Sequence, residues 1–210
     1  MSPSDPAQMN RRWFLRAGTL LGLGAGGVLT ARTAEAGVSS KGSILTPPPA
    51  GTFDERWGAV SEIRGVRKVL SPDEALWAAE RPPMSPEPVY VSEAGLASFQ
   101  VHFYNNFNAR IWICISFEDP ANCSAWGGWG TRGWWSVDPG QSVYVLNTTY
   151  PEVCFYAETG TGWVWTAEDH HIFAPQTAFS SCLWNQRIGD RYLGMRRRGL
   201  VEGPNTFTLQ

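Results

Sequence analysis

The chain lacks a long hydrophobic run and carries little net charge. Its longest weakly apolar stretch, residues 17–31, contains five glycines and is shorter than the roughly 20 apolar residues that a membrane-spanning helix needs. The formal net charge is −2 over 210 residues, and the basic cluster near the C-terminus is short, at 196–198. General nucleic-acid binding needs a basic stripe that neutralises phosphates. The composition therefore argues against a nucleic-acid binder and against a stable membrane span in the mature form.

Familiar catalytic and metal-binding motifs are missing as well. No C-x-x-C pair and no G-x-S-x-G element occurs, so neither a tetrathiolate zinc site nor a serine-hydrolase elbow is indicated. The only dense group of ligand-type side chains is Glu-Asp-His-His at 168–171. Adjacent histidines on a strand point to opposite faces, so this group predicts ordinary exposed polar side chains. The sequence indicates no cofactor and no metal.

The N-terminus, by contrast, carries a clear pattern. A basic run at 10–16 precedes the apolar stretch, and a small-x-small motif follows at 34–36. This is the layout of a secretory signal peptide. The paired arginines and the weakly apolar middle resemble a twin-arginine (Tat) signal, which exports folded proteins. The residues expected to be recognised are Arg11, Arg12, Phe14 and Leu15.

The signal predicts where the protein goes. Cleavage is expected after residue 36, with Ala34 and Ala36 forming the cleavage site; retention of the apolar stretch as an anchor is the alternative. The Tat translocase is the expected partner during export, and the mature protein is expected in the periplasm or outside the cell. Residues 1–36 hold four arginines and two carboxylates, so their removal changes the formal net charge from −2 to −4.

Residues 37–97 are rich in proline, which favours extended backbone and cannot continue helices or inner strands. The segment is therefore expected to be a linker or wrapping arm. One short helix is predicted inside it, with Ser71 as N-cap, Pro72 at the first helical position and Glu74 completing a capping box. Leu76 and Trp77 of this helix are expected to dock onto the following domain.

Residues 98–210 are expected to form a tryptophan-rich β domain. The predicted strands are 99–103, 110–117, 133–137, 142–146, 153–157 and 163–165. The strand at 110–117 is apolar on both faces and should be an inner strand. A type II turn at Asp138-Pro139-Gly140 is expected to join 133–137 and 142–146 in a hairpin. The pattern predicts an all-β fold, a small antiparallel β-sandwich or partly open barrel with an extended, proline-rich N-terminal arm.

One bacterial family shows a similar pattern. Its features are Phe-Tyr-Asn-Asn at 103–106, Ile-Trp-Ile at 111–113, Gly-Trp-Trp at 133–135 before Val-Asp-Pro-Gly at 137–140, and Phe-Tyr-Ala-Glu at 155–158. With these, the stretch from about 101 to 198 resembles the bacterial domain of unknown function 1036. The resemblance implies a small β domain in the cell envelope. It brings no known activity and no catalytic residues.

Four cysteines follow the signal in an exported chain, which most simply means two disulfides. Cys114 and Cys154 both fall on predicted strands, where neighbours can be bridged. Cys123 lies in a loop, and Cys182 lies near the end of the domain. The favoured pairing is Cys114–Cys154 with Cys123–Cys182, although three connectivities exist and the spacing does not choose among them.

Tryptophan is unusually abundant, with 11 residues in the chain. A small domain cannot bury all of these indoles, and exposed aromatic rings on a rigid sheet are how proteins bind flat surfaces such as sugar rings. The residues expected to form a ligand-facing aromatic surface are Trp126, Trp129, Trp163 and Trp165. A tryptophan-heavy core is the alternative.

The sequence thus favours an exported, non-enzymatic binding or structural module of the cell envelope. Its expected ligand is a glycan or an envelope protein. A periplasmic enzyme acting on glycans is the alternative, for which carboxylates such as Glu118, Asp119, Glu158 and Glu168 would have to supply a catalytic pair.

Overall fold

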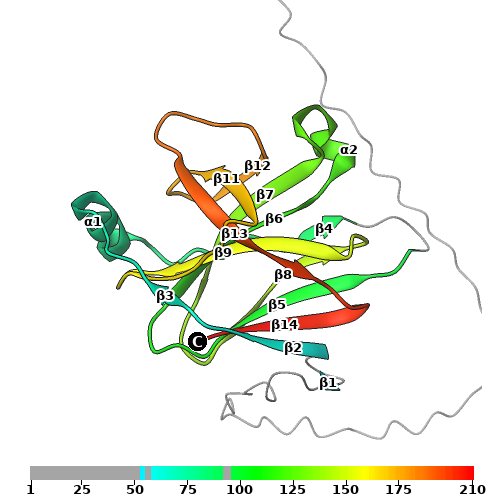
Figure 1. Ribbon diagram of the computed structural model, residues 1–210, viewed down its shortest axis with the longest axis horizontal. Coiled ribbons are helices and arrows are strands. Elements are labelled where there is room, and N and C mark those ends of the chain that lie inside the picture. Colours follow the sequence, from blue (N-terminus) through cyan, green and yellow to red (C-terminus); the bar gives the residue numbers. More distant parts are fainter. Residues whose placement is uncertain (1–52, 55–57, 92–95) are drawn as a thin grey trace, which may run out of the picture. The chain divides into compact units, whose positions relative to one another are not determined.

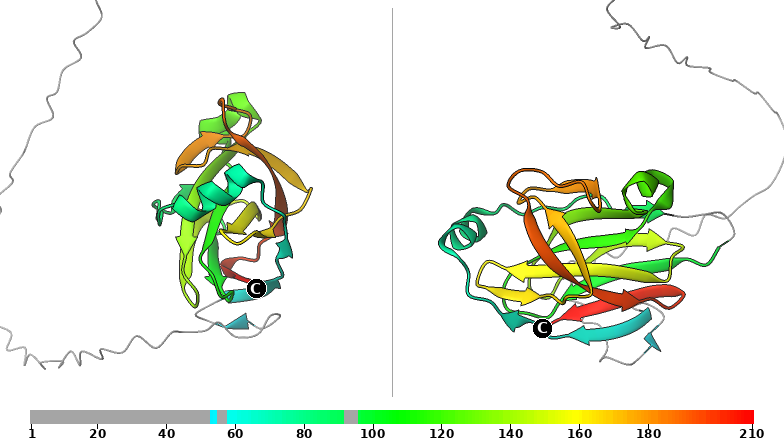
Figure 2. Two further views of the ribbon diagram at one scale, coloured as in Figure 1. Left: turned by 90° about the vertical axis from the view of Figure 1, so that its left-hand side faces the viewer. Right: turned by 45° about the horizontal axis from the view of Figure 1, so that its top comes forward.

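Two β-sheets packed face to face make up the fold (Figures 1 and 2). The computed structural model describes residues 53–54, 58–91 and 96–210. The described helices include none that is long and apolar enough to cross a membrane. The expected all-β sandwich is confirmed, and its described strands do not close into a barrel. The signal and cleavage residues lie outside the described residues: Arg11, Arg12, Phe14, Leu15, Ala34 and Ala36.

The first sheet has six strands and is mixed. In spatial order it contains β1 (Phe53–Asp54), β2 (Gly58–Ile63), β14 (Gly203–Leu209), β5 (Phe99–Asn105), β8 (Ser142–Thr148) and β4 (Val89–Val91). The C-terminal strand β14 runs parallel to both β2 and β5, and β4 runs parallel to β8. The antiparallel pairs are β5 with β8 and, at the edge, β1 with β2.

The second sheet has eight strands. Its main path is β11 (His170–Ala174), β13 (Arg191–Gly199), β9 (Glu152–Thr159), β6 (Ile111–Glu118), β7 (Trp129–Val137) and β12 (Phe179–Cys182). The short strand β10 (Trp163–Trp165) pairs with β9 and with β3 (Val66–Arg67). The helical segments are α1 (Pro72–Glu80), α2 (Pro120–Cys123) and the 3₁₀ turn η1 (Ser124–Trp126).

Two apolar clusters bury the central strands. The cluster between the sheets includes Phe103, Phe155 and Phe207, with 5.0 Å between the ring centroids of Phe103 and Phe155. A second cluster, around Trp134 and Met195, covers the opposite face of the second sheet. β6 is consequently buried on both faces, which confirms the inner strand expected from its apolar sequence.

The segment expected to be a linker or arm is built into both sheets. β2 and β4 belong to the first sheet, and β3 pairs with β10 of the second. The expected boundary at residue 98 therefore does not separate an arm from the domain. The sequence did not reveal that β2, β3 and β4 belong to the sheets, because these strands are short and most of their partners lie far along the chain.

Helix α1 begins as its sequence predicts. The Ser71 hydroxyl accepts a hydrogen bond from the Glu74 backbone N–H at 3.3 Å, and the Glu74 carboxylate accepts one from the Ser71 N–H at 3.0 Å. This capping box satisfies two free N–H groups of the first turn. Trp77 packs against Trp134 with ring centroids 6.3 Å apart, whereas Leu76 is exposed, so only one of the two expected docking residues is used.

The expected hairpin of residues 133–146 is wrong, although its turn is present. Gly140 has φ of 72°, and the Gln141 N–H donates to the Asp138 carbonyl at 3.0 Å, as a type II turn requires. However, β7 pairs with β6 and β12, while β8 pairs with β5 and β4. The turn therefore crosses from one sheet to the other. Asn105 holds the crossing, because its side chain donates to the Val137 carbonyl at 2.8 Å.

Candidate functional site

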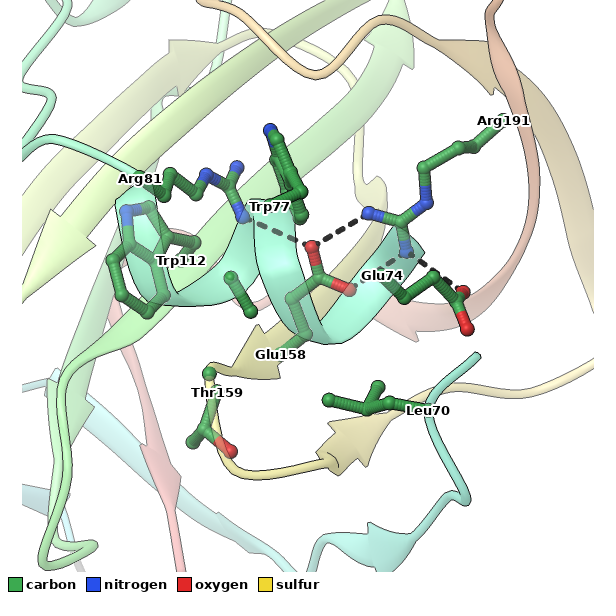
Figure 3. A pocket seen from close by; sticks show the side chains of 10 residues that line it. Leu70, Glu74, Trp77, Arg81, Trp112, Glu158, Thr159 and Arg191 are labelled. Atoms are coloured by element: carbon green, nitrogen blue, oxygen red, sulfur yellow. Dashed lines mark hydrogen bonds and ion pairs between the residues drawn. The ribbon is translucent and has the colours of Figure 1, made fainter. Parts of the chain in front are cut away.

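The densest group of charged side chains is a buried ion cluster beneath α1 (Figure 3). Glu158 of β9 accepts hydrogen bonds from Arg81 at 2.9 Å and from both terminal nitrogens of Arg191 at 2.9 and 2.8 Å. The Tyr156 hydroxyl donates to the same carboxylate at 2.7 Å. The side chains of Arg81 and Glu158 are 1% and 7% exposed, so one carboxylate compensates two arginines in a nearly dry environment.

Arg81 is also enclosed by aromatic rings. Its guanidinium carbon lies 4.0 Å from the ring centroid of Trp77 and 4.1 Å from that of Trp134, an arrangement that favours a cation electrostatically. Burial lowers the pKa of Arg81 to about 9, and the charge of Glu158 opposes that shift. The arginine thus joins α1, through Trp77, to the second sheet.

This cluster has charged groups of the kind found in active sites, but the cavity beside it is too small to admit a substrate. The cavity next to it measures about 10 Å³, which is about the room of a single water molecule. Burial raises the pKa of Tyr156, and the neighbouring Glu158 raises it further, so the phenol stays protonated. The cluster therefore fixes α1 in place, with room beside it for about one water molecule.

A second polar group lies on the outer face of the second sheet. Ser116 and His170 are linked at 3.0 Å between the hydroxyl oxygen and Nε2. Burial, with smaller contributions from Arg197 and His171, lowers the pKa of His170 to about 4, so its ring is neutral at pH 7. Ser116 is fully buried, and the half-buried Trp129 covers His170 with ring centroids 4.9 Å apart. A serine closed off in this way cannot attack a substrate.

The remaining catalytic and metal candidates are not arranged for catalysis or metal binding in the part of the chain that the structure describes. Burial raises the pKa of the Cys154 thiol to about 11, so it is a weak nucleophile. Glu158 is held in the ion cluster, while Glu168 is largely exposed and pairs with His171 at 2.7 Å. The described part of the chain contains no group of three or more His, Cys, Asp or Glu side chains placed to hold a metal ion.

One of the two expected disulfides is formed. Cys123 in α2 is bonded to Cys182 at the end of β12. The expected Cys114–Cys154 bond is wrong, and both side chains are buried free thiols. The register of β6 and β9 explains this: Cys114 lies opposite Tyr156, and Cys154 lies opposite Ser116. Such diagonal neighbours are about 7–8 Å apart, beyond the usual Cα separation of a disulfide.

The four tryptophans expected to share a surface are not together. Trp165 is fully buried in the inter-sheet core, where its Nε1–H donates to the Ile63 carbonyl at 2.9 Å. Trp163 is half-buried and packs on Phe107 with 5.4 Å between ring centroids. Both follow the end of β9 that pairs with Ile111, whereas Trp129 pairs with Glu118 at the other end of β6. Of the four, only Trp126 is exposed.

A different pair of indoles is exposed, beside the disulfide. Trp126 follows Cys123 by three residues, Trp184 follows Cys182 by two, and their exposed fractions are 45% and 54%. A Cβ placed on Gly127 would lie 3.3 Å from Nε1 of Trp184, so the second indole packs directly over the residue after the first. Gly127 also has φ of 86°, a conformation that glycine adopts without strain. We refer to Trp126 and Trp184 as the exposed indole pair.

A groove of about 390 Å³ is lined in part by the same disulfide. We call it the inter-sheet groove, because it runs between β4 of the first sheet and the β7–β12 part of the second. Its size is within the roughly 300–1,000 Å³ of ligand pockets. The lining residues used below are Asp119, Asn122, Arg132 and Ser180, together with Cys123 and Cys182.

Sequence reasoning missed Trp184 and Arg132. Trp184 stands next to a cysteine in a polar loop, and this position beside a covalent crosslink is the signal that could have marked it. Arg132 lies inside a predominantly apolar strand and opposite Ile115 of β6. Directly paired residues share a face, so this arginine is on the inner face of the sheet, which no local pattern could reveal.

Comparisons of the chain with protein-family models, with curated proteins and with solved structures found no match.

Proposed function

We propose that this protein is a non-enzymatic binding module of the cell envelope, exported through the Tat pathway, that binds glycans through the exposed indole pair. The observation that carries the proposal is the placement of Trp126 and Trp184 on two loops tied together by the Cys123–Cys182 disulfide. Indole rings stack on the apolar faces of sugars, and a crosslinked pair of loops holds such rings in place without ordering them on binding.

The polar clusters of the second sheet support binding rather than catalysis. The buried ion cluster of Glu158, Arg81 and Arg191 has room beside it for about one water molecule, and the Ser116–His170 pair is covered by Trp129. The similarity to domain of unknown function 1036 adds the expectation of an envelope location. The twin-arginine signal and the disulfide agree with an oxidising compartment.

Replacing both exposed indoles tests the function. The W126A/W184A double variant is expected to lose retention on the glycan that the native protein binds, with an affinity at least about tenfold lower, because both stacking rings are gone. Its thermal midpoint should change little, since exposed substitutions usually cost less than about 0.5 kcal/mol each. Co-sedimentation with peptidoglycan sacculi, chitin and cellulose, and affinity electrophoresis in soluble polysaccharides, measure retention.

The matched control is W165A, which removes the same side chain from the core. It should cost about 3–5 kcal/mol of unfolding free energy. Unchanged glycan retention in the folded W126A/W184A variant would contradict the proposal. Retention of an envelope protein in place of any glycan would reassign the ligand of the indole pair.

The export route has its own test. Changing both signal arginines, in an R11K/R12K variant, is expected to leave unprocessed protein in the cytoplasm, because the Tat translocase recognises the arginine pair. Cell fractionation with detection of the precursor and the mature form measures this. Normal processing and accumulation of the double variant in the periplasm would favour the general secretory route instead.

A further inference from the structure

The inter-sheet groove contains a cation on a face that otherwise forms the core. Arg132 of β7 lies opposite Ile115 and is half-buried. The structure records no ion pair or hydrogen bond between the Arg132 side chain and any described residue. Half-buried arginines are normally paired, since desolvation of an isolated charge is costly. Other arginines of the domain follow this rule: Arg81 and Arg191 share Glu158, and Arg110 pairs with Asp138.

The only carboxylate that lines the groove is already engaged. Asp119 is the N-cap of α2, and its oxygens accept hydrogen bonds from Nδ2 of Asn122 at 2.9 and 3.1 Å. Its role is local, because it holds the first turn of the helix. The guanidinium of Arg132 thus offers a planar fork of donors to an anion that enters the groove.

The other lining groups suit a sugar that carries this anion. Ser180, opposite Arg132 on β12, provides a hydroxyl at the groove, and Asn122 provides a side-chain amide. Hydroxyl and amide groups beside an arginine can hydrogen-bond the hydroxyls and the acidic group of a sugar. The guanidinium of Arg132 carries one positive charge, which matches the single charge of a carboxylate better than the double charge of a phosphate.

We infer that the inter-sheet groove is a subsite for an acidic sugar residue, whose carboxylate is bound by Arg132. The inference rests on the proposed glycan-binding function and names its substrate class. The exposed indole pair and the groove are close in the fold because both adjoin the Cys123–Cys182 disulfide. One glycan chain can therefore stack on the indoles while its carboxylate enters the groove.

Calorimetric titration with a matched pair of oligosaccharides tests the subsite. The probes are tetragalacturonate and the same tetramer after reduction of its carboxyl groups, both at physiological ionic strength. The native protein is expected to bind the acidic form at least about tenfold more tightly, as a charged hydrogen-bonded pair allows. R132Q should bind both forms with the affinity of the neutral one, and R132K, which lacks the fork, should lie between.

The control is R67Q, which removes one positive charge from an exposed position on β3. It should keep the preference for the acidic form, so a loss confined to R132Q is not a general charge effect. W126A/W184A should weaken both probes equally. Thermal midpoints of all variants show that they are folded.

The outcomes separate the subsite from the proposed function. Equal binding of both probes by the native protein, or an unchanged acidic preference in folded R132Q, overturns the subsite and leaves the glycan-binding function standing. If the native protein binds neither probe and shows no indole-dependent binding of any other glycan, both the subsite and the glycan-binding function are overturned. Arg132-dependent binding of a tetraglutamate peptide in place of the sugar overturns the sugar assignment and makes an acidic peptide the ligand of the groove.

Discussion

Replacement of Glu158 by Gln is expected to lower the free energy of unfolding by about 3–5 kcal/mol, which is the cost of leaving buried charges without their partner. Glu158 is the only described carboxylate within 3 Å of Arg81 or Arg191. Glu74 reaches Arg191 only at 4.0 Å. The neutral amide would keep the volume of the side chain but leave two arginines with a large uncompensated charge.

Urea unfolding followed by tryptophan fluorescence measures the effect of E158Q. The matched control is E168Q, because Glu168 has the same side chain but is 84% exposed and pairs only with His171. Its substitution should change the unfolding free energy by less than about 0.5 kcal/mol. If E158Q were as stable as E168Q, the ion cluster would not hold α1 to the sheet.

Loss of the Cys123–Cys182 disulfide is the second large effect we expect. The bond closes a loop of 59 residues, so removing it in a C123S/C182S variant should cost about 4 kcal/mol, chiefly by releasing the unfolded chain. Because the disulfide adjoins both the indole pair and the groove, glycan retention should fall as well. Guanidinium unfolding and the glycan retention assay measure the two consequences.

Thiol titration checks the disulfide pattern itself. The unreduced, denatured protein should show two reactive thiols, from Cys114 and Cys154. The folded protein should show none that reacts quickly, because both side chains are buried. Absence of thiols after denaturation would mean that Cys114 and Cys154 are bonded and that the β6–β9 register differs from the one described. C154A serves as a control that keeps the disulfide intact.

Local features were predictable because neighbouring residues alone specify them. The capping box of Ser71 and Glu74 needs only residues within one helical turn. The strands predicted at 153–157 and 163–165 are neighbours along the chain, and β9 and β10 do pair, with Trp165 opposite Ala157. The Asp138–Gln141 turn shows the limit of this reasoning. Its geometry was predicted, but the strands on either side join different sheets, since β6 and β5 are their better-matched partners.

The sequence by itself determined the β class, the start of α1 and the inner position of β6. Periodicity, capping and turn residues act over a few positions, and so they can be read in order along the chain. Only the tertiary structure decided which tryptophans are exposed, because Trp165 and Trp126 differ in depth rather than in local pattern. It also decided that Glu158 joins Arg81 from 77 residues away. Burial and ion pairing arise between segments remote in sequence, and the register of packed sheets sets them.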